Sequence, residues 1–248
     1  MPLAIRHVAA MSILFDSQAA RWSTTLPGIG PQAFDPQAWR EAARVTGEAP
    51  GRGASLFLDA GDGREWVLRP YRRGGLIARL SATRYLWTGL ERTRAFRELR
   101  LTATLHERGL PVPRPVAAAV TRLGLTYEAT LITERIPGAR ALASRLEAGR
   151  ADAALLETVG ETIQRCHDAG LDHVDLNARN LLIDDEARVW LIDLDRCRLR
   201  AKGAWQAANL ARLERSLVKF GALDAMAPIR RGYEASPTAG RRGDSRSG

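Results

Sequence analysis

The residues best suited to chemistry form one short polar stretch. It reads H-x-D-L-x-x-x-N from His173 to Asn180, and a following apolar segment ends at Asp193. Asp175 is suited to orient an attacking hydroxyl and to accept its proton, which is general-base chemistry. Asn180 and Asp193 offer the oxygen ligands that Mg²⁺ prefers, and His173 would orient the loop through side-chain hydrogen bonds. These groups suit phosphoryl transfer, which depends mainly on positioning and charge stabilisation.

The spacing of these groups is more specific than any one of them. The asparagine follows the aspartate by five positions, and Asp193 follows Asn180 by thirteen. The apolar segments 181–183 and 188–192 flank Asp184-Asp185-Glu186, which predicts a hairpin that brings Asp193 back beside Asn180. This order is typical of the catalytic and metal loops of kinases. The alternative, an Asp/Asn-rich turn that caps a helix, explains less of the pattern.

The metal loop departs from the usual kinase pattern. Kinases carry Asp-Phe-Gly where this chain has Asp193-Leu194-Asp195. Asp193 keeps the role of metal ligand. Asp195 is expected to be structural and to bind Arg196 or Arg198, with a supporting role beside the metal as the alternative.

A glycine pair near residue 50 is a candidate phosphate-binding turn. Gly51 and Gly53 precede the segment 54–59, which is expected to form a hairpin with 65–69 across Gly61-Asp62-Gly63. Glycines between strands let backbone amides approach phosphate oxygens. A plain turn explains the pair about equally well.

The cation that grips the phosphates must be an arginine. The segment Trp66-Val67-Leu68-Arg69 stands where kinases carry Val-Ala-Ile-Lys, but the only lysines of the chain are Lys202 and Lys219. Arg69 is therefore the candidate, because a guanidinium can hold phosphate oxygens and pair with a carboxylate at the same time.

The carboxylate partner of this arginine is expected on an amphipathic helix. Apolar residues recur at helical spacing over 93–107, and Gly109 and Pro111 end the pattern. Glu98 is the best candidate on this helix. The alternative is a surface charge that pairs with Arg94, one turn earlier.

The order of elements predicts an α+β chain with two lobes and a protein-kinase-like fold. Residues 5–15 could hold a strand, and strands and one helix dominate up to 134–138, where we expect the hinge whose backbone receives the adenine. Helices dominate afterwards. The expected parts are a β-rich N-terminal lobe (1–137), a helical C-terminal lobe with the catalytic and metal loops (138–235), and a Ser/Gly/Arg-rich disordered tail (236–248).

Composition narrows the setting. The chain has 248 residues, 45% of them hydrophobic, and two cysteines, which suits a soluble protein with a real core in a reducing compartment. We expect Cys166 and Cys197 to be core residues. The weakly apolar start, 1–15, is interrupted by Arg6 and His7, so no export is expected.

The positive charge is concentrated in two segments. Residues 69–100 hold nine arginines against two glutamates, and residues 196–248 carry a net charge of +8 within a total of +9. Such asymmetry favours a polyanionic partner, such as nucleic acid, anionic lipid or a phosphorylated substrate. The alternative is a solvated basic face.

With these residues in hand, the chain resembles the lipopolysaccharide kinase family, which comprises the kinases of 3-deoxy-D-manno-octulosonic acid (Kdo) and of heptose. The segments Tyr71–Gly75 and Asp193–Asp195 favour the Kdo kinases. The resemblance covers roughly residues 50–235 and rests on six segments: 51–53, 66–75, 93–98, 110–115, 173–180 and 189–196.

The resemblance implies ATP-dependent phosphorylation, with Mg²⁺, of the 4-hydroxyl of a Kdo residue on a lipid A precursor. Asp175 matches the active-site aspartate of the family. The resemblance also implies a peripheral enzyme at the cytoplasmic face of the bacterial inner membrane. The arginines of 69–100, interleaved with apolar and aromatic residues, suit an anionic bilayer surface and an acidic acceptor. No nucleic-acid partner is expected, and the oligomeric state is left open.

Two other functions stay open at the level of sequence. The first is another kinase, acting on heptose, an aminoglycoside-type molecule or protein, with the same Asp175, Asn180 and Asp193. The second is a non-catalytic, kinase-like module that binds RNA or membrane through its basic segments. The retention of all three polar residues argues against the second.

Overall fold

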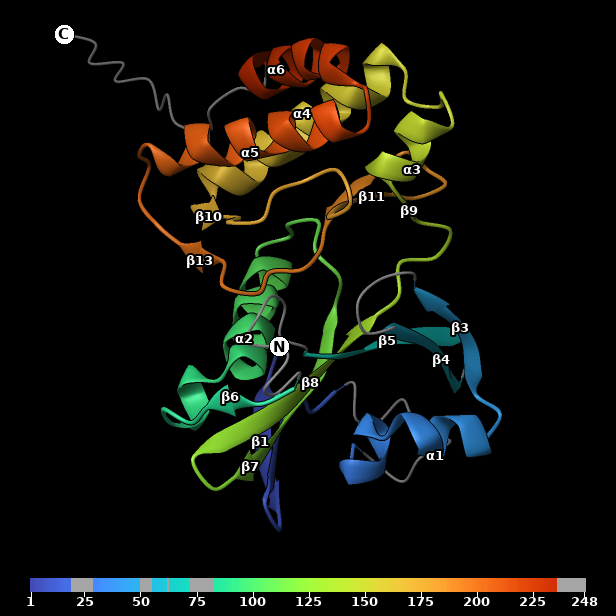
Figure 1. Cartoon of the computed structure of the whole chain (residues 1–248), viewed down its shortest axis with the longest axis vertical. Helices are drawn as coiled ribbons and strands as arrows, with labels where there is room; N and C mark the ends of the chain where they lie inside the picture. Colours follow the sequence, from blue (N-terminus) through green and yellow to red (C-terminus); the bar gives the residue numbers. More distant parts are fainter. Residues whose placement is uncertain (19–28, 50–54, 62, 72–82, 236–248) are drawn as a thin grey trace, which may run out of the picture. The chain divides into compact units, whose positions relative to one another are not determined.

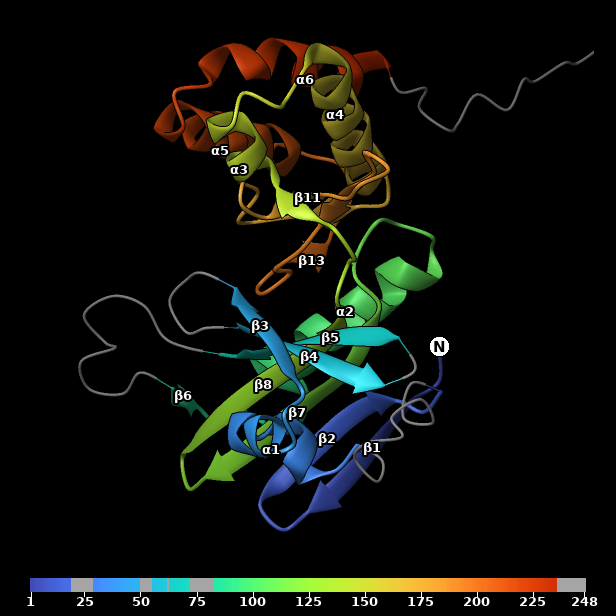
Figure 2. The same ribbon diagram turned by 90° about the vertical axis from the view of Figure 1, so that its right-hand side faces the viewer.

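The fold is given by a computed structural model, which describes residues 1–18, 29–49, 55–61, 63–71 and 83–235 (Figures 1 and 2). It divides into two compact units. Unit 1 comprises Met1–Gly138 and Asp193–Arg196, and unit 2 comprises Ala139–Ile192 and the chain from Cys197 onward. The chain therefore returns to unit 1 for only the four residues that begin at Asp193. The glycine pair Gly51 and Gly53, most of Tyr71–Gly75 and the tail after Ala235 lie outside the described residues.

Unit 1 is built on an antiparallel sheet with the strand order β1-β2-β7-β8-β5-β4-β3, and β6 pairs with β8 (Figure 2). The strands are β1 (Leu3–Val8), β2 (Met11–Asp16), β3 (Val45–Ala49), β4 (Ser55–Gly61), β5 (Arg64–Pro70), β6 (Tyr85–Leu86), β7 (Pro115–Leu123) and β8 (Thr126–Glu134). The helices are α1 (Pro36–Glu41) and α2 (Arg94–Glu107), with short 3₁₀ turns at Pro31–Phe34 and Leu90–Arg92.

Both faces of this sheet are covered, and the alternation of side chains along the central strand β7 shows how. Ala117 and Ala119 face the core cluster that contains Trp39 of α1. Ala118 and Val120 face the cluster that contains α2. Because successive side chains of a strand point to opposite faces, a strand buried on both faces reads as a continuous apolar run.

The elements predicted for unit 1 are confirmed in its middle part but not at its N-terminal end. The predicted hairpin of β4 and β5 and the helix over 93–107 are confirmed, and α2 begins after Thr93 as its N-cap. The single strand expected within residues 5–15 is instead a hairpin of β1 and β2. Its turn at Ala9 has a positive φ of 50°, a conformation that the sequence Ala9-Ala10 does not signal.

Unit 2 is mainly helical and contains two small sheets, with strand orders β12-β11-β9 and β10-β13. Its helices are α3 (Leu142–Glu147), α4 (Ala153–Asp168), α5 (Trp205–Lys219) and α6 (Met226–Ala235), and a 3₁₀ turn spans Leu223–Ala225. Its strands are β9 (Arg140–Ala141), β10 (Leu171–Asp172), β11 (Leu181–Ile183), β12 (Val189–Leu191) and β13 (Arg198–Leu199).

Helices α4 and α6 lie side by side with their backbones in close approach (Figures 1 and 2). A Cβ atom added to Gly160 would lie 2.0 Å from the carbonyl oxygen of Ile229, and one added to Gly232 would lie 1.9 Å from the carbonyl oxygen of Glu157. Each helix thus uses a glycine where the other's backbone passes. Helix α6 was not expected from the sequence.

The predicted hairpin of β11 and β12 is confirmed and is held by the buried carboxylate of Asp184. This carboxylate accepts hydrogen bonds from the backbone amides of Glu186 and Arg188, from the Arg188 guanidinium and from the Trp190 indole. Burial alone would raise the pKa of Asp184, but these donors lower it below its ordinary value. The hairpin fixes the chain that leads into Asp193.

Both cysteines are free and buried, as expected of core residues, and burial raises the pKa of Cys166 to about 12. Among the described residues, none of the helices is both long and apolar enough to cross a membrane.

The buried His167 makes the stability of unit 2 depend on pH. Its ring contacts Trp205 and Tyr233, and its Nδ1 lies 2.8 Å from the Tyr233 hydroxyl. Burial lowers the pKa of His167 to about 4 from 6.5. The unfolded chain therefore binds this proton more tightly, so stability is lost as the pH falls below 6.5. From pH 7 to pH 5 we expect a loss of about 2 kcal/mol from this residue.

Urea unfolding at several pH values measures this loss. His167→Gln keeps a polar side chain but removes the titration, so its stability should fall less between pH 7 and pH 5 than that of the wild type. Equal pH dependence in the two proteins would show that His167 does not cause the loss.

Candidate active site

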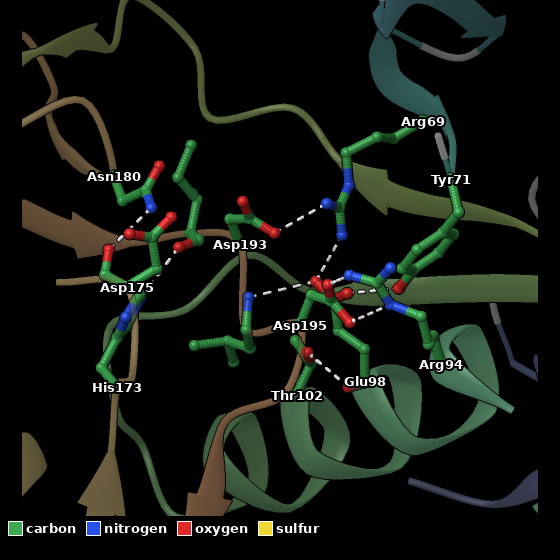
Figure 3. A network of polar contacts seen from close by, with 12 residues as sticks. Arg69, Tyr71, Arg94, Glu98, Thr102, His173, Asp175, Asn180, Asp193 and Asp195 are labelled. Atoms are coloured by element: carbon green, nitrogen blue, oxygen red, sulfur yellow. Dashed lines mark hydrogen bonds and ion pairs between the residues drawn. The ribbon is translucent and has the colours of Figure 1, made fainter. Parts of the chain in front are cut away.

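The unit 1 half of the candidate site is centred on Arg69 of β5 and Glu98 of α2 (Figure 3). Arg69 lies on β5, and Glu98 projects from the helix that covers one face of the sheet. Arg69 Nη2 donates to Glu98 Oε1 at 2.5 Å, and Arg69 Nη1 donates to Asp193 Oδ1 at 2.7 Å. The pair that the sequence suggests between Arg69 and Glu98 is present. Its role in phosphate binding stays a prediction.

Glu98 is a buried carboxylate with both oxygens engaged. Its side chain is 3% exposed. Besides Arg69, Oε1 accepts a hydrogen bond from the backbone amide of Leu194 at 3.1 Å, and Oε2 accepts one from the Tyr71 hydroxyl. The alternative pairing of Glu98 with Arg94 does not occur. Glu98 therefore joins β5, α2 and the metal-loop segment.

The electrostatics of this cluster keep Arg69 charged and Tyr71 neutral at neutral pH. Burial alone would lower the pKa of Arg69, but the carboxylates of Glu98 and Asp193 raise it above its ordinary value. Burial, and next the charge of Glu98, raise the pKa of Tyr71 well above 10. Tyr71 thus remains a phenol that donates to Glu98. The Arg69 guanidinium also lies 4.9 Å from the centre of the Tyr71 ring, in a cation–π contact.

The segment Asp193-Leu194-Asp195 combines an unusual backbone conformation, a buried side chain and a long-range ion pair. Asp193 has a positive φ of 60°, a rare conformation for a residue with a side chain. Leu194 is buried. The sequence suggests Arg196 or Arg198 as the partner of Asp195, but the structure shows an ion pair with Arg94, whose Nε donates to Asp195 Oδ1 at 2.8 Å. The reason is that α2 presents Arg94 to this segment, a long-range contact that neighbours in sequence do not reveal.

The unit 2 half contains the polar loop His173–Asn180. Two side-chain amides, those of Asn177 and Asn180, each donate to the backbone carbonyl of Asp175 at 2.9 Å. The Asn177 side-chain oxygen also accepts from the backbone amides of Arg179 and Asn180. These bonds fix the loop locally. The Asn180 side chain uses its nitrogen here, which leaves its oxygen available as a ligand.

His173 connects the loop to the strand that precedes Asp193. Its ring Nε2 donates to the carbonyl of Ile192 at 3.0 Å, and the Ile192 amide donates to the carbonyl of Asn180 at 3.0 Å. The His173 backbone amide donates to the side-chain oxygen of Asn209 on α5. The residue directly before Asp193 is thus held by two members of the polar loop. Asp193 begins the next segment one peptide bond later.

Asp175 is paired with an arginine that the sequence did not suggest. Arg212 of α5 donates from Nε at 2.8 Å and from Nη2 at 2.5 Å to Asp175 Oδ1. Both side chains are partly exposed, at 47% and 43%. Sequence reasoning also gave no role in the site to Asn209 or Tyr71, and it considered Arg94 only as an alternative partner of Glu98. Tyr71 and Asn177 stand within segments that the sequence marks, whereas nothing in the local pattern marks Asn209, which acts from α5.

The donor atoms fit a nucleotide with its metal. The carboxylate of Asp193 and the amide oxygen of Asn180 are the hard oxygen ligands that suit Mg²⁺, and the orientation of the Asn180 amide leaves that oxygen available. Arg69 is a fixed cation that suits phosphate oxygens. Each unit therefore offers groups of the type that nucleotide phosphates require.

We expect Arg69→Met to separate structure from function in unit 1. The change leaves the nearly buried Glu98 without its cation, which should lower the free energy of unfolding by about 2 kcal/mol, discounted for the partial exposure of Arg69. It should also raise KM for ATP. The double variant Arg69→Met/Glu98→Leu should recover most of the stability but not the activity. Recovery of activity with stability would show that Arg69 does not bind phosphates.

A sheet-based unit followed by a helical unit, with these two groups of polar residues, defines the class of two-lobed, protein-kinase-like enzymes. A solved structure of WaaP in complex with acyl carrier protein has this fold, with a TM-score of 0.54 over 91% of this chain and 90% of that chain at 19% identity. The expected α+β, protein-kinase-like fold is thereby confirmed.

The family is shown by comparison of sequences. Residues 36–231 match the model of the lipopolysaccharide kinase (Kdo/WaaP) family. The chain is a kinase and belongs to this family. It is 47% identical over 224 residues to the 3-deoxy-D-manno-octulosonic acid kinase of Stenotrophomonas maltophilia (strain K279a), covering 90% of this chain and 86% of that protein. It is 48% identical over 211 residues to the enzyme of that name from Xanthomonas campestris pv. campestris (strain B100), covering 84% and 81%.

Proposed function

We propose that this kinase transfers a phosphoryl group from ATP to the 4-hydroxyl of a Kdo residue on a lipid A precursor, in lipopolysaccharide core biosynthesis. The observation that carries the proposal is the intact polar loop in a chain that is 47% identical to a 3-deoxy-D-manno-octulosonic acid kinase over 90% of its length. In this loop, Asp175 is held by two side-chain amides on its own carbonyl. The relatives with that name support Kdo as the acceptor sugar, and the polar loop supports phosphoryl transfer as the reaction.

In the proposed reaction Asp175 orients the acceptor hydroxyl and accepts its proton. The hydrogen bonds of His173 and Asn209 hold the loop that carries Asp175. Arg69 binds phosphate oxygens and is itself oriented by Glu98. Asn180 and Asp193 would hold Mg²⁺, whose chemistry when bound would be to neutralise charge on the transferred phosphate.

A transfer assay with labelled ATP tests the proposal. The acceptors are a Kdo-bearing lipid A precursor, the same precursor without Kdo, a heptose-bearing core fragment, an aminoglycoside and a generic protein substrate. Label should enter only the Kdo-bearing precursor. Label in the heptose fragment, the aminoglycoside or the protein, with none in the Kdo precursor, would overturn the assignment of the acceptor while keeping the kinase chemistry.

We also propose that the enzyme works at the anionic surface of the inner membrane. On unit 1, Leu86 and Leu125 are exposed by 71% and 83%, and the Trp87 amide donates to the Leu125 carbonyl, so these residues lie in adjacent segments. Arg122, close by in sequence, stacks on the Trp87 ring at 5.0 Å. Exposed apolar side chains with arginines beside them suit the interface of an anionic bilayer.

Binding to vesicles is expected to depend on the salt concentration and on the exposed leucines of unit 1, Leu86 and Leu125. Affinity for vesicles with anionic lipid should fall as salt rises from 0.05 M to 0.5 M, on the order of tenfold, because screening weakens exposed charges. Leu125→Ser should weaken binding further, whereas Leu223→Ser, which changes an exposed leucine of unit 2, should not. Salt-independent binding, or equal effects of the two changes, would contradict this surface.

A further inference from the structure

Unit 2 contains an open cavity of about 790 Å³ beside the loop that carries Asp175. Its lining includes Asp172 and Val174, which flank His173 in sequence, and residues from the start and one side of α5. The cavity is therefore formed next to the candidate catalytic loop within a single unit.

The cavity is basic. Four of the side chains that line it are cations: Arg200, Lys202, Arg212 and Arg215. The carboxylate in its lining, Asp172, already accepts hydrogen bonds from Arg200 and Asn209. Burial alone would raise the pKa of Asp172, but these donors lower it. Asp172 therefore stays ionised, and the guanidinium of Arg200 balances its charge. Lys202 pairs with Asp168 at 2.8 Å, so the excess of positive charge at the cavity comes from Arg212 and Arg215.

Helix α5 supplies two of the four cations, Arg212 and Arg215. Trp205, Ala208, Arg212 and Arg215 recur at intervals of three and four residues and line the same cavity. Within the described part of the chain, Arg215 makes no hydrogen bond or ion pair. The N-terminal end of α5, where Ala204 has no side-chain cap, adds partial positive charge.

Arg212 belongs both to this cavity and to the catalytic loop. Its Nε and Nη2 both donate to Oδ1 of Asp175. Because both side chains are partly exposed, solvent screens the pair, and it can be exchanged for another ion pair at low cost. Arg212 can therefore leave Asp175 for another anion without a large loss of stability.

We propose that this cavity binds the negatively charged group of the acceptor, a carboxylate or a phosphate, and that Arg212 moves from Asp175 to this group when the acceptor enters. Arg215 binds the same group. The exchange frees Oδ1 of Asp175 for the acceptor hydroxyl only when an acidic acceptor is present. The inference rests on the proposed function, because Asp175 must be the group that meets the hydroxyl.

Binding of small probes to the full-length protein tests the cavity without turnover. The probes are free Kdo, which has a carboxylate and no phosphate, its methyl ester, which is neutral, and a phosphorylated glucosamine disaccharide without Kdo. At least one acidic probe should bind, and Arg212→Gln and Arg215→Gln should each weaken it about tenfold, the usual loss for a charge-assisted hydrogen bond. Arg231→Gln, which removes an exposed arginine of α6 paired with Glu157, should leave it unchanged.

The probes also identify the recognised group. Binding of Kdo that the methyl ester lacks assigns a carboxylate, and binding of the disaccharide assigns a phosphate. Failure of both acidic probes to bind, or binding that is the same in the wild type and in the Arg212 and Arg215 variants, would overturn the proposed cavity.

Steady-state kinetics distinguish failure of the cavity from failure of the proposed function. In the Arg212 and Arg215 variants, KM for the Kdo-bearing precursor should rise about tenfold while KM for ATP stays within about twofold. Phosphorylation of Kdo with an unchanged acceptor KM in both variants would refute the cavity and keep the function. Arginine-dependent binding of a probe without any phosphorylation of Kdo would support the cavity as an anion site and refute the proposed function.

Discussion

Asp175→Asn is expected to lower kcat for transfer to the Kdo acceptor at least ~100-fold, equivalent to about 2.7 kcal/mol of transition-state stabilisation. The substitution keeps the shape of the side chain but removes the group that accepts the proton of the attacking hydroxyl. The fold should survive, because the backbone carbonyl of Asp175, and not its carboxylate, receives the amides of Asn177 and Asn180. Among the described residues, the carboxylate itself is paired with the partly exposed Arg212 alone.

The loss is measured with saturating ATP and acceptor, alongside thermal unfolding of each protein. Asp185→Asn is the matched control, because it removes an exposed carboxylate from the turn between β11 and β12 of the same unit. The control should retain near-normal turnover. Turnover of Asp175→Asn within a few-fold of the wild type would remove Asp175 from the role of general base.

Gly232→Ala is expected to destabilise unit 2 by about 3 kcal/mol or more, and Gly160→Ala similarly. Alanine normally stabilises a helix relative to glycine by about 1 kcal/mol. Here its Cβ would meet a backbone carbonyl oxygen at 1.9 Å or 2.0 Å. Backbone cannot turn away as a side chain can, so α4 and α6 must separate and lose packing. The clash therefore outweighs the gain in helix propensity.

Equilibrium unfolding in urea gives this free energy, and Gly203→Ala is the control. A Cβ atom at Gly203 would approach only the side chain of Trp205, at 3.6 Å, which is an ordinary contact. Its stability should change little. If Gly232→Ala and Gly160→Ala were as stable as the wild type, the close approach of α4 and α6 would be wrong.

The elements that the sequence predicts are those with strong local signals. The hairpin of β4 and β5 consists of two short apolar segments on either side of a glycine turn, and α2 carries an apolar stripe that ends at Gly109, where φ is +69°. The hairpin of β11 and β12 turns on Asp184, whose short carboxylate satisfies the amides of its own turn. In these cases local chemistry and the final structure agree.

The elements that were missed depend on contacts distant in sequence. The β1–β2 hairpin turns at Ala9, which lacks the usual Gly or Asn signal. Helix α6 has a short pattern and depends on the glycine contact with α4. Charge and nearness in sequence do not predict which charged residues pair, since Arg94 binds Asp195 from 101 residues away. Local spacing cannot identify such partners.

The residues of the candidate site also divide into those marked by local sequence signals and those placed by contacts distant in sequence. His173, Asp175 and Asn180 could be identified because their spacing is set by one loop that closes on itself. Arg69 could be identified by elimination, since the chain has no lysine before Lys202. Arg212 could not, because it reaches Asp175 from α5, 37 residues later. The polar loop is thus a local feature, whereas the basic cavity beside it is a product of the fold.

The most direct test of the central claim is the structure of the product. Purified enzyme is incubated with ATP, Mg²⁺ and the Kdo-bearing lipid A precursor, and the product is analysed by mass spectrometry and phosphorus NMR. We predict the addition of one phosphoryl group to the 4-hydroxyl of Kdo by the wild type and at least ~100-fold less by Asp175→Asn. A product phosphorylated elsewhere, or no product from a folded wild-type enzyme, would contradict the proposed function.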